Sequence, residues 1–134
     1  MKRMSNPYFM VLSLSLVVLL SCATAPVKPI TQADLPDLKG EWEGFYQERG
    51  GRFNDPIELE IISEDLKGNW TWHHANRPPY TFPFDGKIEN GRILCPWPGG
   101  QVNLSLRKGD GKMKLEGDFQ VERWEGTMHL NKVK

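Results

Sequence analysis

The sequence predicts an all-β fold: a small antiparallel up-and-down barrel of about eight strands, preceded by a signal peptide and a flexible tether. Three observations support this fold class. Apolar and polar residues alternate with a period of two along most of the chain after residue 37, which is the pattern of a strand with one buried face. Turn signals interrupt the alternation at short intervals, and helical periodicity is missing from this region.

Four of the expected strands lie in the first half of the patterned region. They are residues 38–47, 57–61, 70–74 and 80–85. In each strand, bulky apolar side chains recur at every second position, so one face can be buried while the other meets solvent. Residue types that favour turns separate the strands, as in Ser63-Glu64-Asp65 and in the proline-rich loop from Asn76 to Pro79.

The second half contains the remaining expected strands. They are residues 93–97, 102–107, 113–121 and 124–130. Glu89-Asn90-Gly91 predicts a tight hairpin, because Asn-Gly accepts positive φ at both central positions. Pro98-Gly99-Gly100 and Gly109-Asp110-Gly111 mark two further turns. Short links of this kind make neighbouring strands antiparallel, since a parallel crossover needs about a dozen residues or more.

About eight antiparallel strands, each with one apolar face, form either a sandwich or a closed barrel. We favour the barrel because closure removes both exposed sheet edges, and these strands carry few features beyond surface charge that would protect an edge. The apolar faces also carry glycines that permit the sharp bends of a small barrel, namely Gly40, Gly44, Gly68, Gly117 and Gly126. Room for a neighbouring bulky ring is the alternative explanation for these glycines.

A signal peptide is expected at residues 1–21. Lys2 and Arg3 form a basic start, and residues 8–20 form an almost wholly apolar stretch. This stretch is shorter than the ~20 residues that a helix needs to span the bilayer. An uncleaved anchor or a buried core helix is the alternative.

The end of this segment, Leu19-Leu20-Ser21-Cys22, resembles the lipobox of bacterial lipoproteins. The resemblance implies cleavage before Cys22, a diacylglycerol on its sulfur and usually a further acyl chain on its amino group. Two or three acyl chains anchor a protein stably, at roughly 0.8 kcal/mol for each buried CH₂ group. Ala23 stands where aspartate is the usual inner-membrane retention signal, so we expect a lipid-anchored envelope protein at the outer membrane, facing the periplasm.

Residues 22–37 are expected to be the tether between this anchor and a domain at residues 38–134. Proline recurs in the stretch without apolar periodicity, at Pro26, Pro29 and Pro36. With Cys22 assigned to lipid, Cys95 has no intramolecular partner and is expected to be a small buried hydrophobe. A disulfide between Cys22 and Cys95 is the alternative, and it would exclude lipidation.

The composition argues against several classes of function. The chain carries 17 basic and 17 acidic residues, which gives no electrostatic case for binding nucleic acid or an acidic lipid surface. The nucleophile elbow, the phosphate loop and the zinc-protease motif are missing, so we expect no enzymatic activity and no cofactor. Glu58 and Glu60 share one face of a strand, and we expect them to be solvated rather than a catalytic carboxylate pair.

The histidines are the candidates for a metal site. His73 and His74 are neighbours in a strand and point to opposite faces, so they cannot chelate one metal without a bulge. His129 is expected on the outer face with His73, and two histidines with a nearby carboxylate can bind zinc. Ordinary surface histidines are the simpler explanation, and we expect no metal.

The segment Leu38-Lys39-Gly40-Glu41-Trp42 opens the first expected strand. A Gly-x-Trp at this place in an eight-stranded barrel resembles the pattern of the lipocalins and related calycins. The resemblance implies that Gly40 and Trp42 form a structural motif in which Trp42 closes the barrel floor beneath a basic side chain from near the last strand. Arg123 and Lys132 are the candidates for that side chain. The Thr-Asp-Tyr motif and the long first loop of full-size lipocalins are absent from this sequence.

Aromatic residues dominate the faces expected to point inward. An eight-stranded barrel is only wide enough for its own side chains or for one small ligand. If the barrel has a mouth, we expect it near the proline-rich loops, lined by Trp70, Trp72, His74, Tyr80, Phe82 and Trp97. The number of large rings favours a filled interior instead.

Two functions are therefore open. In the first, the domain is a membrane-anchored, non-enzymatic interaction module that contacts an envelope protein or peptidoglycan through its loops and outer strand faces. In the second, it binds a small apolar molecule inside the barrel, as lipocalins do. An enclosed apolar void of roughly 300 Å³ or more, lined by Trp70, Trp72 and Phe82, would favour the second. Because the number of large aromatic rings expected inside the barrel favours a filled interior, we favour the interaction module.

Overall fold

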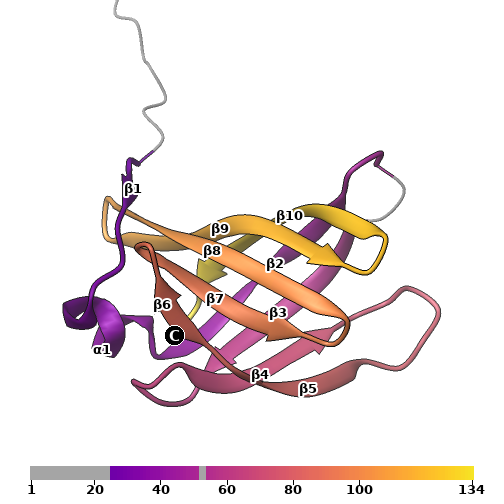
Figure 1. Cartoon of the computed structure of the whole chain (residues 1–134), viewed down its shortest axis with the longest axis horizontal. Coiled ribbons are helices and arrows are strands. Elements are labelled where there is room, and N and C mark those ends of the chain that lie inside the picture. The colour runs from indigo at the N-terminus through magenta and orange to yellow at the C-terminus, as the bar shows by residue number, and fades with distance from the viewer. Residues whose placement is uncertain (1–24, 52–53) are drawn as a thin grey trace, which may run out of the picture.

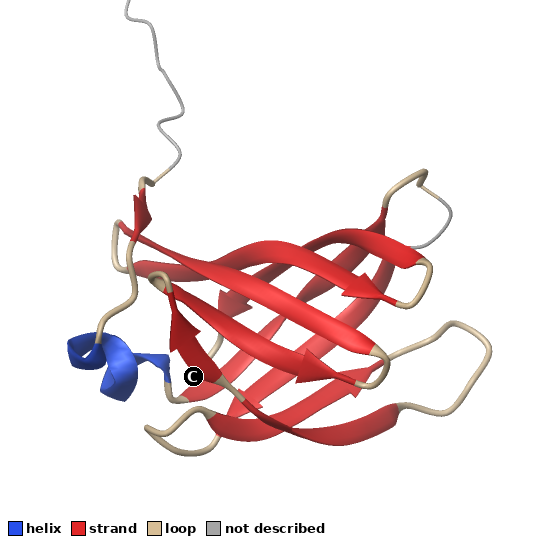
Figure 2. Cartoon of the chain, in the orientation of Figure 1, coloured by secondary structure: helices blue, strands red, loops and turns tan. Residues whose placement is uncertain are grey.

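The computed structural model describes residues 25–51 and 54–134, which form a nearly closed antiparallel β-barrel (Figure 1). Figure 2 shows that strands dominate this unit, with one short helical segment and loops between the strands. The predicted signal peptide at residues 1–21 and the predicted lipidation site Cys22 lie outside the described residues. The strands of the barrel wall are β2 (Gly40–Glu48), β3 (Asn54–Ile61), β4 (Lys67–Trp72), β5 (Tyr80–Asp85), β6 (Lys87–Glu89), β7 (Arg92–Trp97), β8 (Gly100–Gly109), β9 (Lys112–Val121) and β10 (Trp124–Lys132).

The first and last strands of the wall are neighbours. β2 pairs with β10 along most of its length, from Trp42 opposite Lys132 to Glu48 opposite Gly126. Pairing between the first and last strands closes a sheet into a barrel, whereas a sandwich leaves edges open. The prediction of an antiparallel up-and-down barrel is therefore confirmed.

The other side of the wall closes through one bent segment. β5 pairs with β4, and β6, which begins after Gly86, pairs with β7. β5 and β6 thus form one extended stretch that changes its partner at Gly86. If this stretch is counted as one strand, the nine strands of the wall correspond to the eight that were expected. Across this seam the rings of Phe82 in β5 and Trp97 in β7 meet edge to face, with 4.6 Å between their centroids.

The N-terminal segment differs from the expected flexible tether. β1 (Val27–Lys28) pairs with the end of β8, and a single 3₁₀ turn then leads into the short helix α1 (Leu35–Leu38). Figure 1 shows both elements at one end of the barrel. Ile30 and Leu38 are buried in the core. The domain therefore begins before residue 38. The alternation of the sequence does not indicate this, because the few apolar side chains of residues 25–38 follow no strand period.

A buried carboxylate holds this segment in place. Asp34 is 2 % exposed, and its oxygens accept from Lys28 Nζ at 2.8 Å, the Thr31 backbone N–H at 2.9 Å and Lys108 Nζ at 3.2 Å. The Lys28 contact, followed by the Thr31 amide and Lys108, holds the pKa of Asp34 well below its usual range in spite of burial. β1, the 3₁₀ turn and β8 are thus joined by one side chain.

Trp42 is buried at the end of the barrel beside α1. Its ring is fully buried, and Nε1 donates a hydrogen bond to the Leu38 carbonyl at 2.9 Å. Lys132 Nζ lies 5.8 Å from the centre of the ring, within the range of a cation–π contact. The basic side chain implied by the lipocalin resemblance is therefore Lys132. Arg123 lies at the opposite end of the barrel, over the ring of Trp124.

The half of the barrel next to α1 is filled. Its buried side chains alternate with partly or fully exposed ones along β3 and β8, and the largest of them include Trp42, Trp70, Leu59, Leu104 and Leu115. Cys95 is part of this core, and burial raises the pKa of its thiol to about 12. It is a small buried residue of the core, as expected.

Two inward glycines stand where the backbones of adjacent strands come close. A Cβ atom on Gly44 would lie 1.7 Å from the His129 carbonyl oxygen, and one on Gly117 would lie 1.6 Å from the Asn103 carbonyl oxygen. Real side chains do not tolerate such distances, so these positions require glycine for the wall to bend. These contacts support the explanation that the glycines permit the wall to bend. At Gly126, both the backbone of the neighbouring strand and the ring of Phe119 are close.

Within residues 25–51 and 54–134, no helix is both long enough and apolar enough to cross a membrane.

Candidate functional site: an aromatic cup

The end of the barrel opposite α1 is hollow. A cup of about 430 Å³ opens there, where the loops after β2, β4, β7 and β9 gather. Rings make up most of its wall, and the side chains that line it are Tyr46, Trp72, His74, Arg77, Tyr80, Phe82, Trp97, Pro98, Phe119, Val121, Glu122, Trp124 and Met128. In Figure 1 this end lies to the right, across the barrel from α1.

The structure brings together the residues that the sequence placed at a mouth. Trp72, His74, Tyr80, Phe82 and Trp97 all line the cup. The sixth, Trp70, is fully buried beneath it, with its ring 5.5 Å from that of Trp97. The indole N–H of Trp70 has no hydrogen-bond partner in the described structure. Trp70 therefore forms part of the packing below the cup rather than its wall.

The rings of the wall support one another at angles. Tyr46 meets Phe119 edge to face at 5.0 Å between centroids, and Trp72 at 5.9 Å. Phe82 and Trp97 form a similar pair on the facing side. Such arrangements are the preferred geometry of aromatic pairs and hold each ring in one orientation. The cup is consequently a preformed apolar surface.

A buried carboxylate behind the wall orients two of these rings. Asp55 is 8 % exposed, and its Oδ2 accepts from Trp72 Nε1 at 3.1 Å and from the Tyr46 hydroxyl at 3.5 Å. Burial, and then the charge of Asp55, raises the pKa of Tyr46 to about 12. Tyr46 is therefore neutral at physiological pH and donates its proton towards the carboxylate.

Sequence reasoning missed several of these residues. Asp55 lies just before the expected strand 57–61, although the alternation of Ile57, Leu59 and Ile61 extends back to it and places it on the inward face. Tyr46 and Trp124 lie in the expected strands 38–47 and 124–130 but are not among the residues expected at the mouth. The signal that could have found them is the pairing of β2 with β10, which no local pattern specifies.

The histidines do not come together. His73 Nε2 lies 3.2 Å from Glu58 Oε1, whereas His129 stacks on Phe45 and lies 3.8 Å from Glu116. In the described part of the chain, no three His, Cys, Asp or Glu side chains are grouped so that they could hold a metal ion. Glu58 and Glu60 are exposed on the outer face of β3, as expected.

The cup only partly matches the enclosed void that would favour ligand binding. Its volume exceeds the expected threshold, and Trp72 and Phe82 line it, but it is open to solvent and Trp70 lies outside it. The interior is thus divided: the half near α1 is filled with side chains, and the half near the loops is not.

Comparisons with known proteins add little to this geometry. No family model matches the chain, and no solved structure matches it. Over 103 residues it is 23% identical to a lipoate–protein ligase of Streptococcus pyogenes serotype M5 (strain Manfredo). The matched region is 75% of this chain and 24% of the ligase, so the chain spans about a quarter of the length of that protein. A likeness of this extent assigns neither a family nor an activity.

Proposed function

We propose that this chain is a lipid-anchored binding protein of the cell envelope, and that its aromatic cup takes one small, largely apolar molecule with a flat ring. The cup carries the proposal, because about 430 Å³ of space is open at one end of a barrel whose other half is filled. Ligand pockets typically have volumes of roughly 300–1,000 Å³ and mostly apolar, aromatic walls.

The distribution of polar groups supports an apolar ligand. The Asp55 carboxylate behind the wall already accepts hydrogen bonds from Trp72 and Tyr46, so it presents no unpaired charge to a ligand. The polar lining residues His74, Arg77 and Glu122 come from the loops at the lip. A flat ring can pack against the angled rings of the wall in the geometry that aromatic pairs prefer.

The location forms the second part of the proposal. We propose that Cys22 carries a diacylglycerol, and that the protein is held at the outer membrane and faces the periplasm. The lipobox-like Leu19-Leu20-Ser21-Cys22 supports this. Binding without catalysis is proposed because the sequence lacks the nucleophile elbow, the phosphate loop and the zinc-protease motif.

Titration with the apolar fluorescent probe N-phenyl-1-naphthylamine tests the cup. We expect saturable binding, with energy transfer from the tryptophans of the wall to the probe. Tyr80 is 57% exposed at the lip, so Tyr80→Ala removes one ring of the cup without opening the core. The loss of one aromatic contact is expected to weaken probe binding about fivefold to tenfold.

Phe45→Ala is the matched control, because Phe45 is an exposed ring on the outer wall, 39% exposed and stacked on His129. This variant should bind the probe as the natural chain does. Equal weakening by both variants, or binding that never saturates, would contradict a specific cup.

The cup's lip also supports the interaction module as a second candidate. Tyr80 and the loop residues 75–79 are exposed, and rigid prolines beside an exposed ring suit contact with another macromolecule. Cosedimentation with peptidoglycan sacculi tests it. If Tyr80→Ala abolishes cosedimentation while the natural chain fails to bind the probe, the cup is a docking site and not a ligand site.

A further inference from the structure

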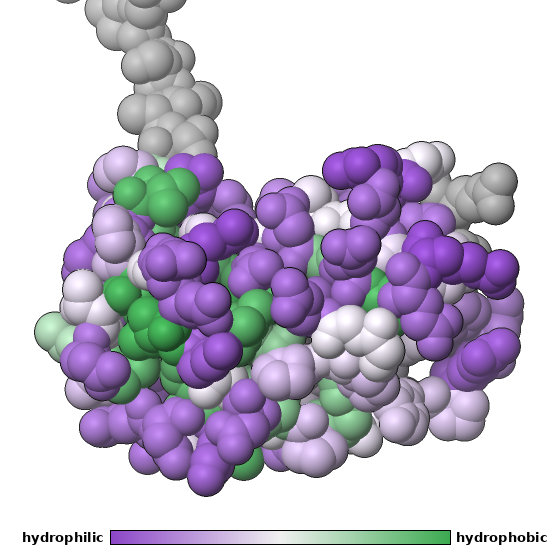
Figure 3. All heavy atoms as spheres, in the orientation of Figure 1, coloured by the Kyte–Doolittle hydropathy of each residue, from purple (hydrophilic) through white to green (hydrophobic). Residues whose placement is uncertain are grey.

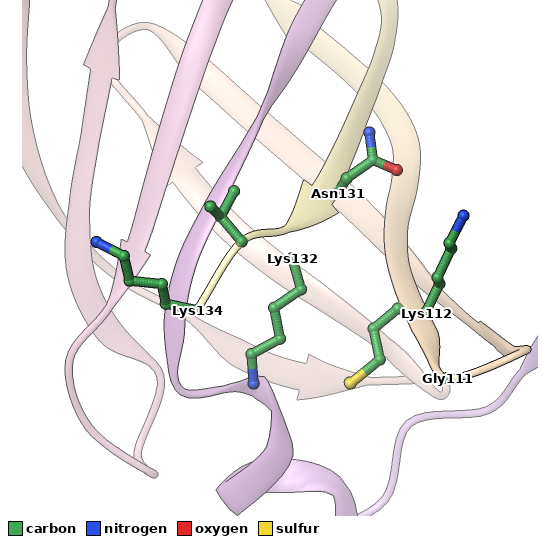
Figure 4. Close-up of a pocket in the computed structure, with 7 residues that line it drawn as sticks. Gly111, Lys112, Asn131, Lys132 and Lys134 are labelled. Atoms are coloured by element: carbon green, nitrogen blue, oxygen red, sulfur yellow. The ribbon is translucent and has the colours of Figure 1, made fainter.

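The end of the barrel opposite the cup has a chemistry of its own. Lys112, Lys132 and Lys134 line an open hollow of about 500 Å³ there, and Lys114 lies two residues further along β9. We call these four lysines the basic end. Figure 4 shows the three lysines of the hollow extending in different directions from β9, from β10 and from the chain after β10.

Positive charge at this end is only partly neutralised. Lys134 Nζ lies 3.2 Å from a Glu41 oxygen, and Lys132 Nζ donates to the Asp37 backbone carbonyl. Lys112 and Lys114 are exposed and have no ion pair among the residues that the structure describes. Of these four lysines, only Lys134 therefore has a carboxylate partner among the described residues.

Exposed apolar side chains surround the same end. Val27, Ile62 and Val133 are 51%, 51% and 47% exposed, and they lie in β1, directly after β3 and directly after β10. They are three of the five large hydrophobic residues exposed in the described chain. Figure 3 shows hydrophobic side chains gathered on the half that carries β1, while hydrophilic ones dominate the other half of that face.

The chain enters the barrel at this end. Ala25 is the first described residue, and its carbonyl accepts a hydrogen bond from Arg107 Nη1 at 2.7 Å, near the end of β8. Cys22 precedes Ala25 by three residues. An extended chain spans at most ~3.3–3.6 Å per residue, so a lipid on Cys22 would keep this end within about 10 Å of the membrane.

We propose that the basic end, with the exposed Val27, Ile62 and Val133, docks on an anionic phospholipid surface. Lysine ammonium groups attract lipid phosphates, and short apolar side chains can enter the interface beside them. The position next to a membrane rests on the lipid anchor proposed above, whereas the charge and the apolar side chains belong to the barrel itself. In this orientation the aromatic cup faces away from the bilayer.

Vesicle binding by the mature chain without lipid tests this surface. The chain of residues 22–134 with Cys22→Ser contains the core of the described barrel, because every buried apolar side chain among the described residues lies between Ile30 and Leu130. It should cosediment with vesicles of phosphatidylglycerol and phosphatidylcholine in equal parts, but not with phosphatidylcholine alone. Added salt should weaken the binding, because salt screens exposed charges.

Charge reversal identifies the surface involved. Lys112→Glu with Lys114→Glu should weaken binding to the anionic vesicles about thirtyfold or more, from the ordinary contribution of each lysine near such a surface. Arg77→Glu with Arg123→Glu is the matched control, since it makes the same charge change at the cup end. This control should bind as the parent chain does.

Three results would overturn the proposal: no binding to anionic vesicles at low ionic strength, equal binding to neutral vesicles, or an equal loss in both double variants. None of these depends on lipidation, because the tested chain carries no lipid. A failure of the proposed lipid anchor appears instead as a loss of fatty-acid labelling in cells, so the two failures can be distinguished.

Discussion

At the residue scale, single polar side chains decide how the apolar parts of this protein are oriented. Asp34 joins the N-terminal segment to β8 through Lys28 and Lys108, and Asp55 orients the rings of Trp72 and Tyr46. Both carboxylates are buried and paired. Burying a paired carboxylate is tolerable, whereas removing its partners or its charge leaves groups without hydrogen bonds.

We expect Asp34→Asn to lower the free energy of unfolding by about 1–3 kcal/mol at neutral pH, because two lysines lose a charged acceptor. The pKa of Asp34 in the folded state lies below its ordinary value of 3.8. Its contribution is therefore fully present above about pH 4 and is lost as the pH falls further. Urea unfolding at pH 7 and at acid pH measures both effects.

Asp65→Asn is the control for this change, because Asp65 is exposed in the turn before β4 and contacts Ser63 and Lys67. It should leave the stability nearly unchanged, because ion pairs between exposed side chains contribute little. An Asp34→Asn variant as stable as this control at pH 7 would show that the N-terminal segment is not held by the carboxylate.

At the element scale, the wall is curved by glycines that local alternation places on the apolar face. Gly117 faces Met128 of β10 and Leu104 of β8 in the pairing register. Its neighbour's backbone occupies the space that a Cβ would need. β9 can therefore bend at this point only with glycine, and the bend brings β8 and β10 around the core.

We expect Gly117→Ala to lower the free energy of unfolding by about 3 kcal/mol or more. This is above the usual range for an overpacked methyl group, because the clash is with backbone rather than with a movable side chain. Thermal or urea unfolding measures the loss. Gly111→Ala is the control: Gly111 has positive φ and open space around it, so about 1–2 kcal/mol is expected there. An equal loss of stability in both variants would contradict the close approach of the Asn103 backbone to Gly117.

Elements were predictable where one periodicity persisted over several residues. The alternation of Ile57, Leu59 and Ile61 identified β3, and that of Val102, Leu104 and Leu106 identified β8. β1 and α1 were not predicted, because each is too short to show a period and each is stabilised by contacts with distant strands. The change of partner at Gly86 was missed for the same reason.

At the scale of the whole molecule, the barrel has two different ends. The cup opens at one end, and the basic end with the chain's entry point lies at the other. A lipid on Cys22 would make this arrangement functional, because it sets the cup away from the membrane. The length of β2, about 25 Å along the strand, separates the two ends.

Cys22→Ala should abolish labelling of the protein by a fatty-acid analogue and release it from the membrane fraction, because the thioether-linked lipid can no longer form. Cell fractionation and in-cell labelling measure this. Cys95→Ala is the matched control, since Cys95 is buried in the core. Unchanged labelling and fractionation of the Cys22→Ala variant would defeat the lipid anchor.

The sequence alone determined the fold class, the approximate strands and the burial of Cys95 and Trp42, because these depend on local alternation. It also brought Trp72, His74, Tyr80, Phe82 and Trp97 together as a possible mouth. The tertiary structure decided that the barrel is hollow at one end and filled at the other. It also decided that residues 27–38 pack on the barrel and that lysines gather at one end. Such features arise from contacts between distant strands, and alternation along one strand carries no information about which side chains meet across the barrel.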